Sequence, residues 1–162
     1  ANFPQDSGQI AIETASGQTW TYAQMIDMAA RYAGYIRELG VQPGDRVAVQ
    51  VEKSPEALFL YLACLQSGAV YLPLNSAYQE GEIDYFLGDA EPKIFVHQPK
   101  TEAWSEAVCR RRNVPHRFTL AEDNGGKLEQ GRGSWHENAS KAAPMHVLVP
   151  RNFRSYPESY PA

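Results

Sequence analysis

The fold of this 162-residue chain is decided by the stretch from Trp20 to Val96. Its decisive segments, in chain order, are Trp20-Thr21-Tyr22-Ala23-Gln24, Gly44-Asp45-Arg46-Val47-Ala48-Val49-Gln50, Glu52-Lys53-Ser54-Pro55-Glu56, Gly68-Ala69-Val70-Tyr71-Leu72-Pro73-Leu74-Asn75 and Glu82-Ile83-Asp84-Tyr85-Phe86-Leu87-Gly88-Asp89-Ala90-Glu91-Pro92-Lys93. Helix-start signals alternate here with short runs rich in β-branched residues. That alternation predicts βαβ units and a mainly parallel sheet.

Helix starts are the clearest local signals. Thr21 followed by Gln24 is a capping-box pattern, and Gly40 ends the helix that it opens. Ser54-Pro55-Glu56 combines a capping side chain, a proline suited to the first turn and an acidic residue at the positive end of the helix dipole. The helix that follows, 55–67, is apolar almost all round and is therefore expected to be buried.

The remaining elements follow from periodicity. Two further helices are predicted, one from Glu80 or Glu82 to about Asp89 and one over 101–112. The inner face of the second is expected to contain Ala103, Trp104, Ala107 and Val108. Strands are predicted at 10–13, 46–51, 70–74, 93–97 and 114–120.

The order of these segments resembles the N-terminal part of the adenylate-forming (AMP-binding) acyl-CoA synthetases, and within them the malonyl-CoA synthetases. Fatty acyl-CoA synthetases, coumarate-CoA ligase-like enzymes and peptide-synthetase adenylation domains share the outline. The resemblance covers about residues 8–120. It implies an α/β fold: a partial, mainly parallel sheet flanked by helices in an N-terminal subdomain, 1–120. Residues 121–162 are expected to form an irregular tail.

The resemblance also implies an activity for a full-length parent enzyme, an ATP-dependent acid–CoA ligase. Such an enzyme uses ATP, Mg²⁺ and CoA to adenylate a small carboxylic acid and then form a thioester, with malonate or a related acid as the best guess. The family's phosphate loop and catalytic lysine lie downstream of the matching region. No catalytic residue is therefore assigned in this chain, which is expected to be inactive alone. The glycine pairs near Asn124 and Gly131 are read as plain turns.

Three residues are candidates for ligand contacts at the sheet edge. Lys53 and Ser54 stand between a strand end and a helix start, where open α/β sheets bind ligands, and could hold an anionic carboxylate. The simpler reading is a solvated charge and a helix cap, and it is favoured. Lys100 follows the strand predicted at 93–97, at the same sheet edge, and in enzymes similar to this chain basic residues near this place can meet the CoA phosphates.

Several other classes of function are disfavoured. The net charge is −4, and Arg110-Arg111-Arg112 is too short a basic run to indicate a nucleic-acid site. The four histidines show no metal-ligand spacing, and no apolar run approaches the about 18–20 residues of a membrane helix. Cys64 is expected to be buried and Cys109 exposed, both as thiols of a reduced compartment. This favours the cytoplasm, or the mitochondrion if a transit peptide was lost.

The pattern fades after Leu120. Residues 1–109 carry a charge of −8 and residues 110–162 a charge of +4, so the chain becomes basic where it becomes proline-rich. We interpret the chain as truncated, with the residues after about Gly126 read out of frame or otherwise aberrant. One short strand is predicted at 147–149. The rival reading is a stand-alone, non-enzymatic α/β binding domain with a flexible basic tail, which would bind an anionic ligand or a protein partner near Lys53 and Lys100.

Overall fold

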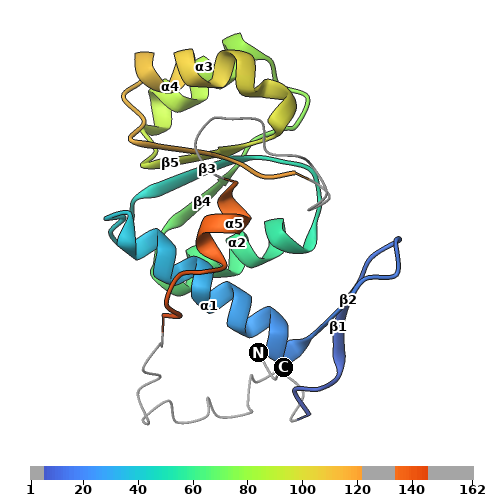
Figure 1. The fold of residues 1–162 in the computed structure, drawn as a ribbon. Coiled ribbons are helices and arrows are strands. Elements are labelled where there is room, and N and C mark those ends of the chain that lie inside the picture. The colour runs from blue at the N-terminus through green and yellow to red at the C-terminus, as the bar shows by residue number, and fades with distance from the viewer. Residues whose placement is uncertain (1–5, 122–133, 146–162) are drawn as a thin grey trace, which may run out of the picture.

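A four-stranded parallel sheet forms the centre of the molecule, with helices on both faces (Figure 1). The computed structural model describes residues 6–121 and 134–145. The elements are β1 (Ile10–Glu13), β2 (Thr19–Thr21), α1 (Tyr22–Glu38), β3 (Arg46–Gln50), α2 (Pro55–Ser67), β4 (Val70–Pro73), α3 (Glu80–Ala90), β5 (Ile94–His97), the 3-10 turn η1 (Pro99–Thr101), α4 (Glu102–Arg111), β6 (His116–Thr119) and α5 (Trp135–Ala139). The strand order in the sheet is β4-β3-β5-β6. The predicted α/β class with a mainly parallel sheet is confirmed.

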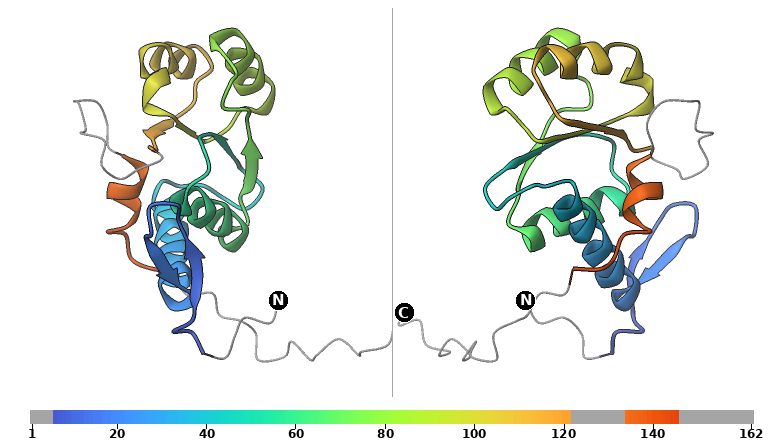
Figure 2. Two further views of the ribbon diagram at one scale, coloured as in Figure 1. Left: turned by 90° about the vertical axis from the view of Figure 1, so that its right-hand side faces the viewer. Right: turned by 60° about the vertical axis from the view of Figure 1, so that its left-hand side comes forward.

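The helices form one layer on each face of the sheet. α1, α2 and α5 lie on one face and α3 and α4 on the other (Figures 1 and 2). Alternate residues of β3 serve the two cores: Val47 and Val49 pack against α1 and α2, whereas Ala48 packs beneath α3 and α4. A separate antiparallel hairpin, β1–β2, leads into α1.

The helix-start signals work as the sequence predicted. The Thr21 hydroxyl accepts a hydrogen bond from the Gln24 amide at 3.2 Å, and the Gln24 side chain accepts one from the Thr21 amide at 2.8 Å. Ser54 caps α2, which begins at Pro55 and ends at Ser67 as predicted. Gly68 closes it with φ 74°, a left-handed conformation that suits glycine.

The inner face of α4 differs from the prediction. Ser105, Val108 and Cys109 are buried, while Ala103 and Ala107 are exposed. Ser105 tolerates burial because its hydroxyl donates to the Thr101 carbonyl at 2.7 Å, whereas the apolar pattern alone assigns this serine to solvent. The same rotation corrects the prediction that Cys109 is exposed, since the residue is only 4% exposed. Cys64 is buried as expected.

A short helix, α5, was not predicted. Ser134 pairs with Thr119 alongside β6, and Trp135 is fully buried against α1 and Phe118. The chain then crosses α1, where the Met145 amide donates to the Ala30 carbonyl at 2.8 Å. The boundary proposed between 1–120 and 121–162 stays a prediction. The glycine turn at 124–127 and the strand at 147–149 lie outside the described residues.

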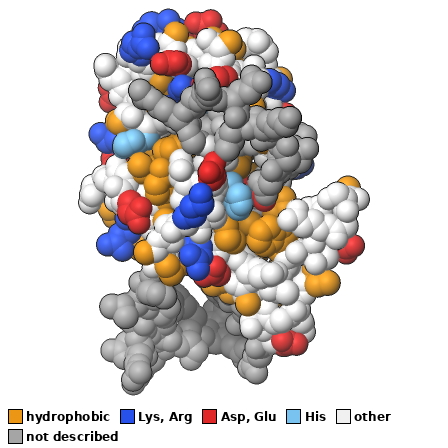
Figure 3. Space-filling view, viewed as in Figure 1, with side chains coloured by type: hydrophobic (Ala, Val, Ile, Leu, Met, Phe, Trp, Pro, Cys, Tyr) orange, Lys and Arg blue, Asp and Glu red, His pale blue; other side chains and the backbone are white. Residues whose placement is uncertain are grey.

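The two helical layers differ on their outer surfaces. On the α3–α4 layer, Asp84 pairs with both Arg111 and Arg112, and Glu80 lies 3.5 Å from Arg111. Charged side chains accordingly gather over this layer, at the top of Figure 3. These pairs hold the pKa of Asp84 at about 2, mainly through the hydrogen bonds from Arg112 and Arg111. The α3–α4 layer therefore has the character of a solvent-facing surface.

Candidate ligand-binding edge of the sheet

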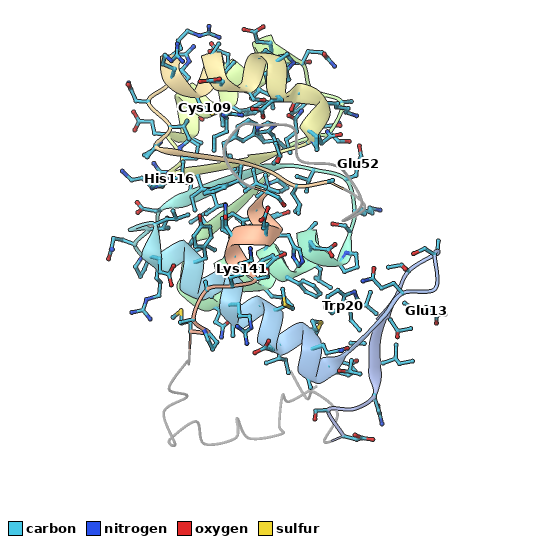
Figure 4. The ribbon with its side chains drawn as sticks, in the orientation of Figure 1. Glu13, Trp20, Glu52, Cys109, His116 and Lys141 are labelled. Atoms are coloured by element: carbon cyan, nitrogen blue, oxygen red, sulfur yellow. The ribbon has the colours of Figure 1, made fainter. Side chains whose placement is uncertain are left out.

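The strand order places a topological switch point at the carboxyl ends of β3 and β5. These strands are neighbours, but α2, which follows β3, covers one face of the sheet and α4, which follows β5, covers the other. Open α/β sheets bind ligands at such a switch point, because the two connections diverge and leave space above the strand ends. Figure 4 marks this edge by Glu52, with His116 at the opposite edge.

Two of the predicted site residues follow β3. Lys53 is exposed, and it makes no ion pair with any described residue. The Ser54 hydroxyl accepts a hydrogen bond from the Ala57 amide at 3.1 Å, so its oxygen is used as the N-cap of α2. The serine proton remains available to an acceptor. Together the ammonium group and the positive end of the α2 dipole make this corner favourable for an anion.

The third predicted residue follows β5. Lys100 is exposed in η1, three residues after the last residue of its strand, as Lys53 is after β3. It too has no ion-pair partner in the described part of the chain. The structure therefore places both lysines after adjacent strands at the same edge. Whether either contacts a ligand stays a prediction.

Beneath this edge lies a pair of buried polar residues. Gln50 and His97 are the last residues of β3 and β5, they are partners in the register of the two strands, and both are fully buried. The Gln50 side-chain nitrogen donates to the carbonyls of Asn75 at 3.1 Å and Tyr78 at 2.8 Å. These bonds tie the connection between β4 and α3 to the carboxyl end of β3.

His97 performs the same task for the connection between β5 and α4. Its Nδ1 lies 2.8 Å from the Gln98 carbonyl and 3.0 Å from the Thr101 hydroxyl. Because the carbonyl can only accept, Nδ1 carries the proton and Nε2 accepts from Arg117 at 3.2 Å. Arg117 also donates to Glu102 at 2.5 Å. The turn that presents Lys100 is therefore fixed at both ends.

Burial keeps His97 neutral. Its pKa is lowered to about 4, mainly by desolvation and also by the nearby Arg117 charge, which together outweigh the opposing effects of the Gln98 carbonyl and Glu102. A neutral imidazole is what the hydrogen bonds require, since a protonated Nε2 would face the Arg117 guanidinium. The cluster is thus a rigid support and has no proton to exchange near neutral pH.

Sequence reasoning missed Gln50, His97 and Arg117. Gln50 and His97 each close a run of buried strand residues at the carboxyl end, which is a detectable signal for a polar group beneath a binding edge. Arg117 gave no sequence signal of this kind, because its partners Glu102 and His97 come from other elements. Sequence patterns indicated strand ends and helix starts but not the pairing across β5 and β6.

The sheet edge suits some of the ligands that the expected reaction uses better than others. The connections 51–54, 74–79 and 98–101 contain no glycine, so they differ from the glycine-rich loops that typically cradle nucleotide phosphates. Exposed lysines fit a carboxylate or a single phosphate. Within residues 6–121 and 134–145 no group of three or more His, Cys, Asp or Glu side chains could hold a metal ion. Nor does any helix there have the length and apolar character to cross a membrane.

Known proteins resemble the chain over most of its length. Its structure superposes on ATP-bound MatB from Rhodopseudomonas palustris with a TM-score of 0.76 at 43% identity, covering 87% of this chain and 26% of that one. A benzoate CoA ligase from Burkholderia xenovorans shares the fold, with a TM-score of 0.72 at 17% identity, covering 89% of this chain and 27% of that one.

Sequence relatives point the same way. A feruloyl-CoA synthase from an Amycolatopsis species is 39% identical over 84 residues, which are 52% of this chain and 17% of that protein. Bacitracin synthase 3 from Bacillus licheniformis is 41% identical over 95 residues, 59% of this chain and 1% of that protein. The chain thus spans a quarter or less of these sequence relatives. The profile of the AMP-binding enzyme family matches residues 2–152, and the chain belongs to that family.

Proposed function

We propose that this chain is the N-terminal part of an ATP-dependent acid–CoA ligase, and that malonate or a related small dicarboxylic acid is its substrate. The enzyme would join the acid to the α-phosphorus of ATP with release of pyrophosphate, and the CoA thiol would then displace AMP. When bound, ATP would supply the adenylyl group and Mg²⁺ would offset the charge of its phosphates. The residues described here would contribute anion-binding positions and the rigid edge that carries them.

One observation carries the proposal: the 43% identity with MatB, a malonyl-CoA synthetase, across 87% of the chain. Identity falls to 17–25% for ligases that act on benzoate, anthranilate or fatty acids. Among the solved structures, that contrast favours a malonate-type acid; the feruloyl-CoA synthase reaches 39% identity over 84 residues, a shorter part of the chain than the 87% that MatB covers. CoA as the thiol is supported by the feruloyl-CoA synthase and the benzoate CoA ligase among the similar proteins.

The two lysines would have different tasks. Lys53 and the Ser54 hydroxyl, at the positive end of α2, would attract the anionic acid toward the carboxyl edge of the sheet. Lys100 would meet a phosphate of CoA, because an exposed ammonium on a fixed turn suits a point contact with a phosphate oxygen. A screened, exposed contact of this type contributes about 1 kcal/mol or less, so binding of either ligand also needs the part of the enzyme beyond this chain.

Isolated, the chain should be inactive, because the phosphate loop and catalytic lysine of similar enzymes follow the region that this chain matches. Both cysteines are unpaired thiols, which fits a reducing compartment, and we propose the cytoplasm. The rival reading, a self-sufficient binding domain, would leave the family match and the exposed apolar surface on α2 without a purpose.

The test uses a longer enzyme: a fusion in which this chain replaces the matching quarter of Rhodopseudomonas palustris MatB. Lys100→Ala should raise the KM for CoA several-fold and leave acid-dependent ATP–pyrophosphate exchange unchanged. Lys53→Ala should raise the KM for the acid in both assays. Lys93→Ala is the matched control, since Lys93 is an exposed lysine immediately before β5, at the opposite edge. Unchanged KM values in both site variants would refute the assigned contacts.

A further inference from the structure

We propose that Arg117 is a positioning residue for CoA binding: it engages the carboxylates of Glu102 and Glu106 and so leaves the Lys100 ammonium group available to a phosphate. The inference rests on the proposed function, because the phosphate is that of CoA. Arg117 would touch no ligand itself and would act only through Glu102 and Lys100.

Glu102 is the described residue best placed to interfere with Lys100. It begins α4 two residues after Lys100 and is the acidic residue closest to that lysine in the chain. Its side chain is 40% exposed, so an unengaged carboxylate could turn toward the Lys100 ammonium group or meet an incoming phosphate. The first event would occupy the lysine and the second would repel the ligand. Lys100 nevertheless pairs with no carboxylate in the described part of the chain.

The position of Arg117 explains why Glu102 does not pair with Lys100. Arg117 Nη1 donates to Glu102 Oε2 at 2.5 Å, and Arg117 Nη2 lies 3.9 Å from Glu106 Oε2. The Arg117 side chain is only 10% exposed, so solvent screens its ion pairs less than those at the surface. Glu102 and Glu106 are one helical turn apart and would repel each other without a cation beside both. Arg117 therefore offsets the negative charge at the start of α4.

Two neighbouring cationic residue types do not replace Arg117. His97 Nε2 lies 3.4 Å from Glu102 Oε2, but burial lowers the pKa of the imidazole to about 4 and keeps it neutral. Arg110 lies 3.2 Å from Glu106 and forms no ion pair with Glu102. Among residues 6–121 and 134–145, Arg117 is thus the one charged cation paired with Glu102 near neutral pH. Arg110 supplies a matched control, since it is an arginine that pairs with Glu106 alone.

The test uses the fusion with the rest of Rhodopseudomonas palustris MatB and measures the KM for CoA. Arg117→Gln releases Glu102 and should raise this KM several-fold, up to about fivefold, which is the range for a screened charge contact. The effect should be confined to the KM for CoA, without a matching fall in kcat. Adding Glu102→Gln should restore the KM to within about twofold of the parent value, because the released carboxylate is then absent. Arg110→Gln removes the same charge and should leave the KM unchanged.

Glu102→Gln alone tests the same idea if Arg117→Gln does not fold. It should lower the KM for CoA, because one negative charge leaves the sheet edge, whereas loss of a purely structural ion pair would raise it. A raised KM in Glu102→Gln would overturn the proposal. So would an Arg117→Gln enzyme whose raised KM is not restored by adding Glu102→Gln, since Arg117 would then act only as a structural support.

The Lys100→Ala enzyme separates this inference from the proposed function. If Lys100→Ala raises the KM for CoA and Arg117→Gln does not, the role assigned to Arg117 is wrong and the CoA contact stands. If Lys100→Ala leaves that KM unchanged, the CoA contact is wrong and the role of Arg117 fails with it.

Discussion

Gly34 of α1 lies against the carbonyl of Ala143, so closely that a Cβ added to Gly34 would overlap the Ala143 oxygen. This contact lets the segment after α5 cross α1 and form the hydrogen bond from Met145 to Ala30. The glycine is required by a close approach of two backbones and not by a positive φ angle, because it sits inside a regular helix.

Gly34→Ala should therefore displace residues 142–145 and destabilise the chain by about 1–3 kcal/mol, since overpacking against backbone costs this much. Chemical denaturation monitored by tryptophan fluorescence measures the change. Gly81→Ala is the control, because a methyl group added to Gly81 in α3 would have open space around it. That variant should be neutral or more stable by up to about 1 kcal/mol. Equal behaviour of the two variants would show that the crossing at Gly34 is wrong.

His97 should make the chain sensitive to acid. Its pKa falls from 6.5 in the unfolded chain to about 4 in the folded state, so between these values the unfolded chain binds more protons. The stability associated with neutral His97 is complete above pH 6.5 and is lost progressively as the pH falls to 4. At full separation of the two pKa values the effect is on the order of 3 kcal/mol.

His97→Gln removes this titration and keeps polar groups at the site. Urea unfolding at about pH 7 and about pH 4.5 should show a smaller loss of stability at the lower pH for this variant than for the parent chain. His116→Gln, at the amino end of β6, provides the comparison at the opposite edge. A parent-like pH dependence in His97→Gln would mean that the imidazole is not held neutral by burial.

Both thiols should be inert in the folded chain. Burial raises the pKa of Cys64 and of Cys109 to about 12, and the partly opposing charge of Arg117 does not restore a thiolate at Cys109. Alkylation by iodoacetamide at about pH 8 should proceed at both residues only after urea is added, as counted by mass spectrometry. Modification of Cys109 under native conditions would contradict its buried position and support the exposed position that its three neighbouring arginines suggested.

Local signals account for what the sequence predicted well. Ser54 and Pro55 mark the start of α2 through capping and backbone geometry, which act within one helical turn and need no knowledge of the rest of the fold. Val47 and Val49 mark β3 for a similar reason, since the alternation of a strand is visible in its own residues. The positions of Lys53 and Lys100 at one edge then follow from parallel pairing alone.

Long-range packing accounts for what the sequence missed. The burial of Ser105 and Cys109 depends on how α4 is rotated above the sheet, and apolar counting chose the alanines instead. Gln50 and His97 meet only because β3 and β5 are neighbours in a particular register. α5 has only five residues, which carry little helical signal of their own. The helix is held because Trp135 packs in a core built mostly from residues much earlier in the chain.

Joining this chain to the remainder of Rhodopseudomonas palustris MatB asks whether it supplies the N-terminal part of an acid–CoA ligase. The measurement is ATP-dependent conversion of malonate and CoA by that fusion, beside the isolated chain. We expect malonyl-CoA formation by the fusion and no malonate-dependent ATP–pyrophosphate exchange by the 162-residue chain. A folded fusion without activity would show that the proposed function is wrong, and exchange catalysed by the chain alone would show that the chain is not inactive by itself.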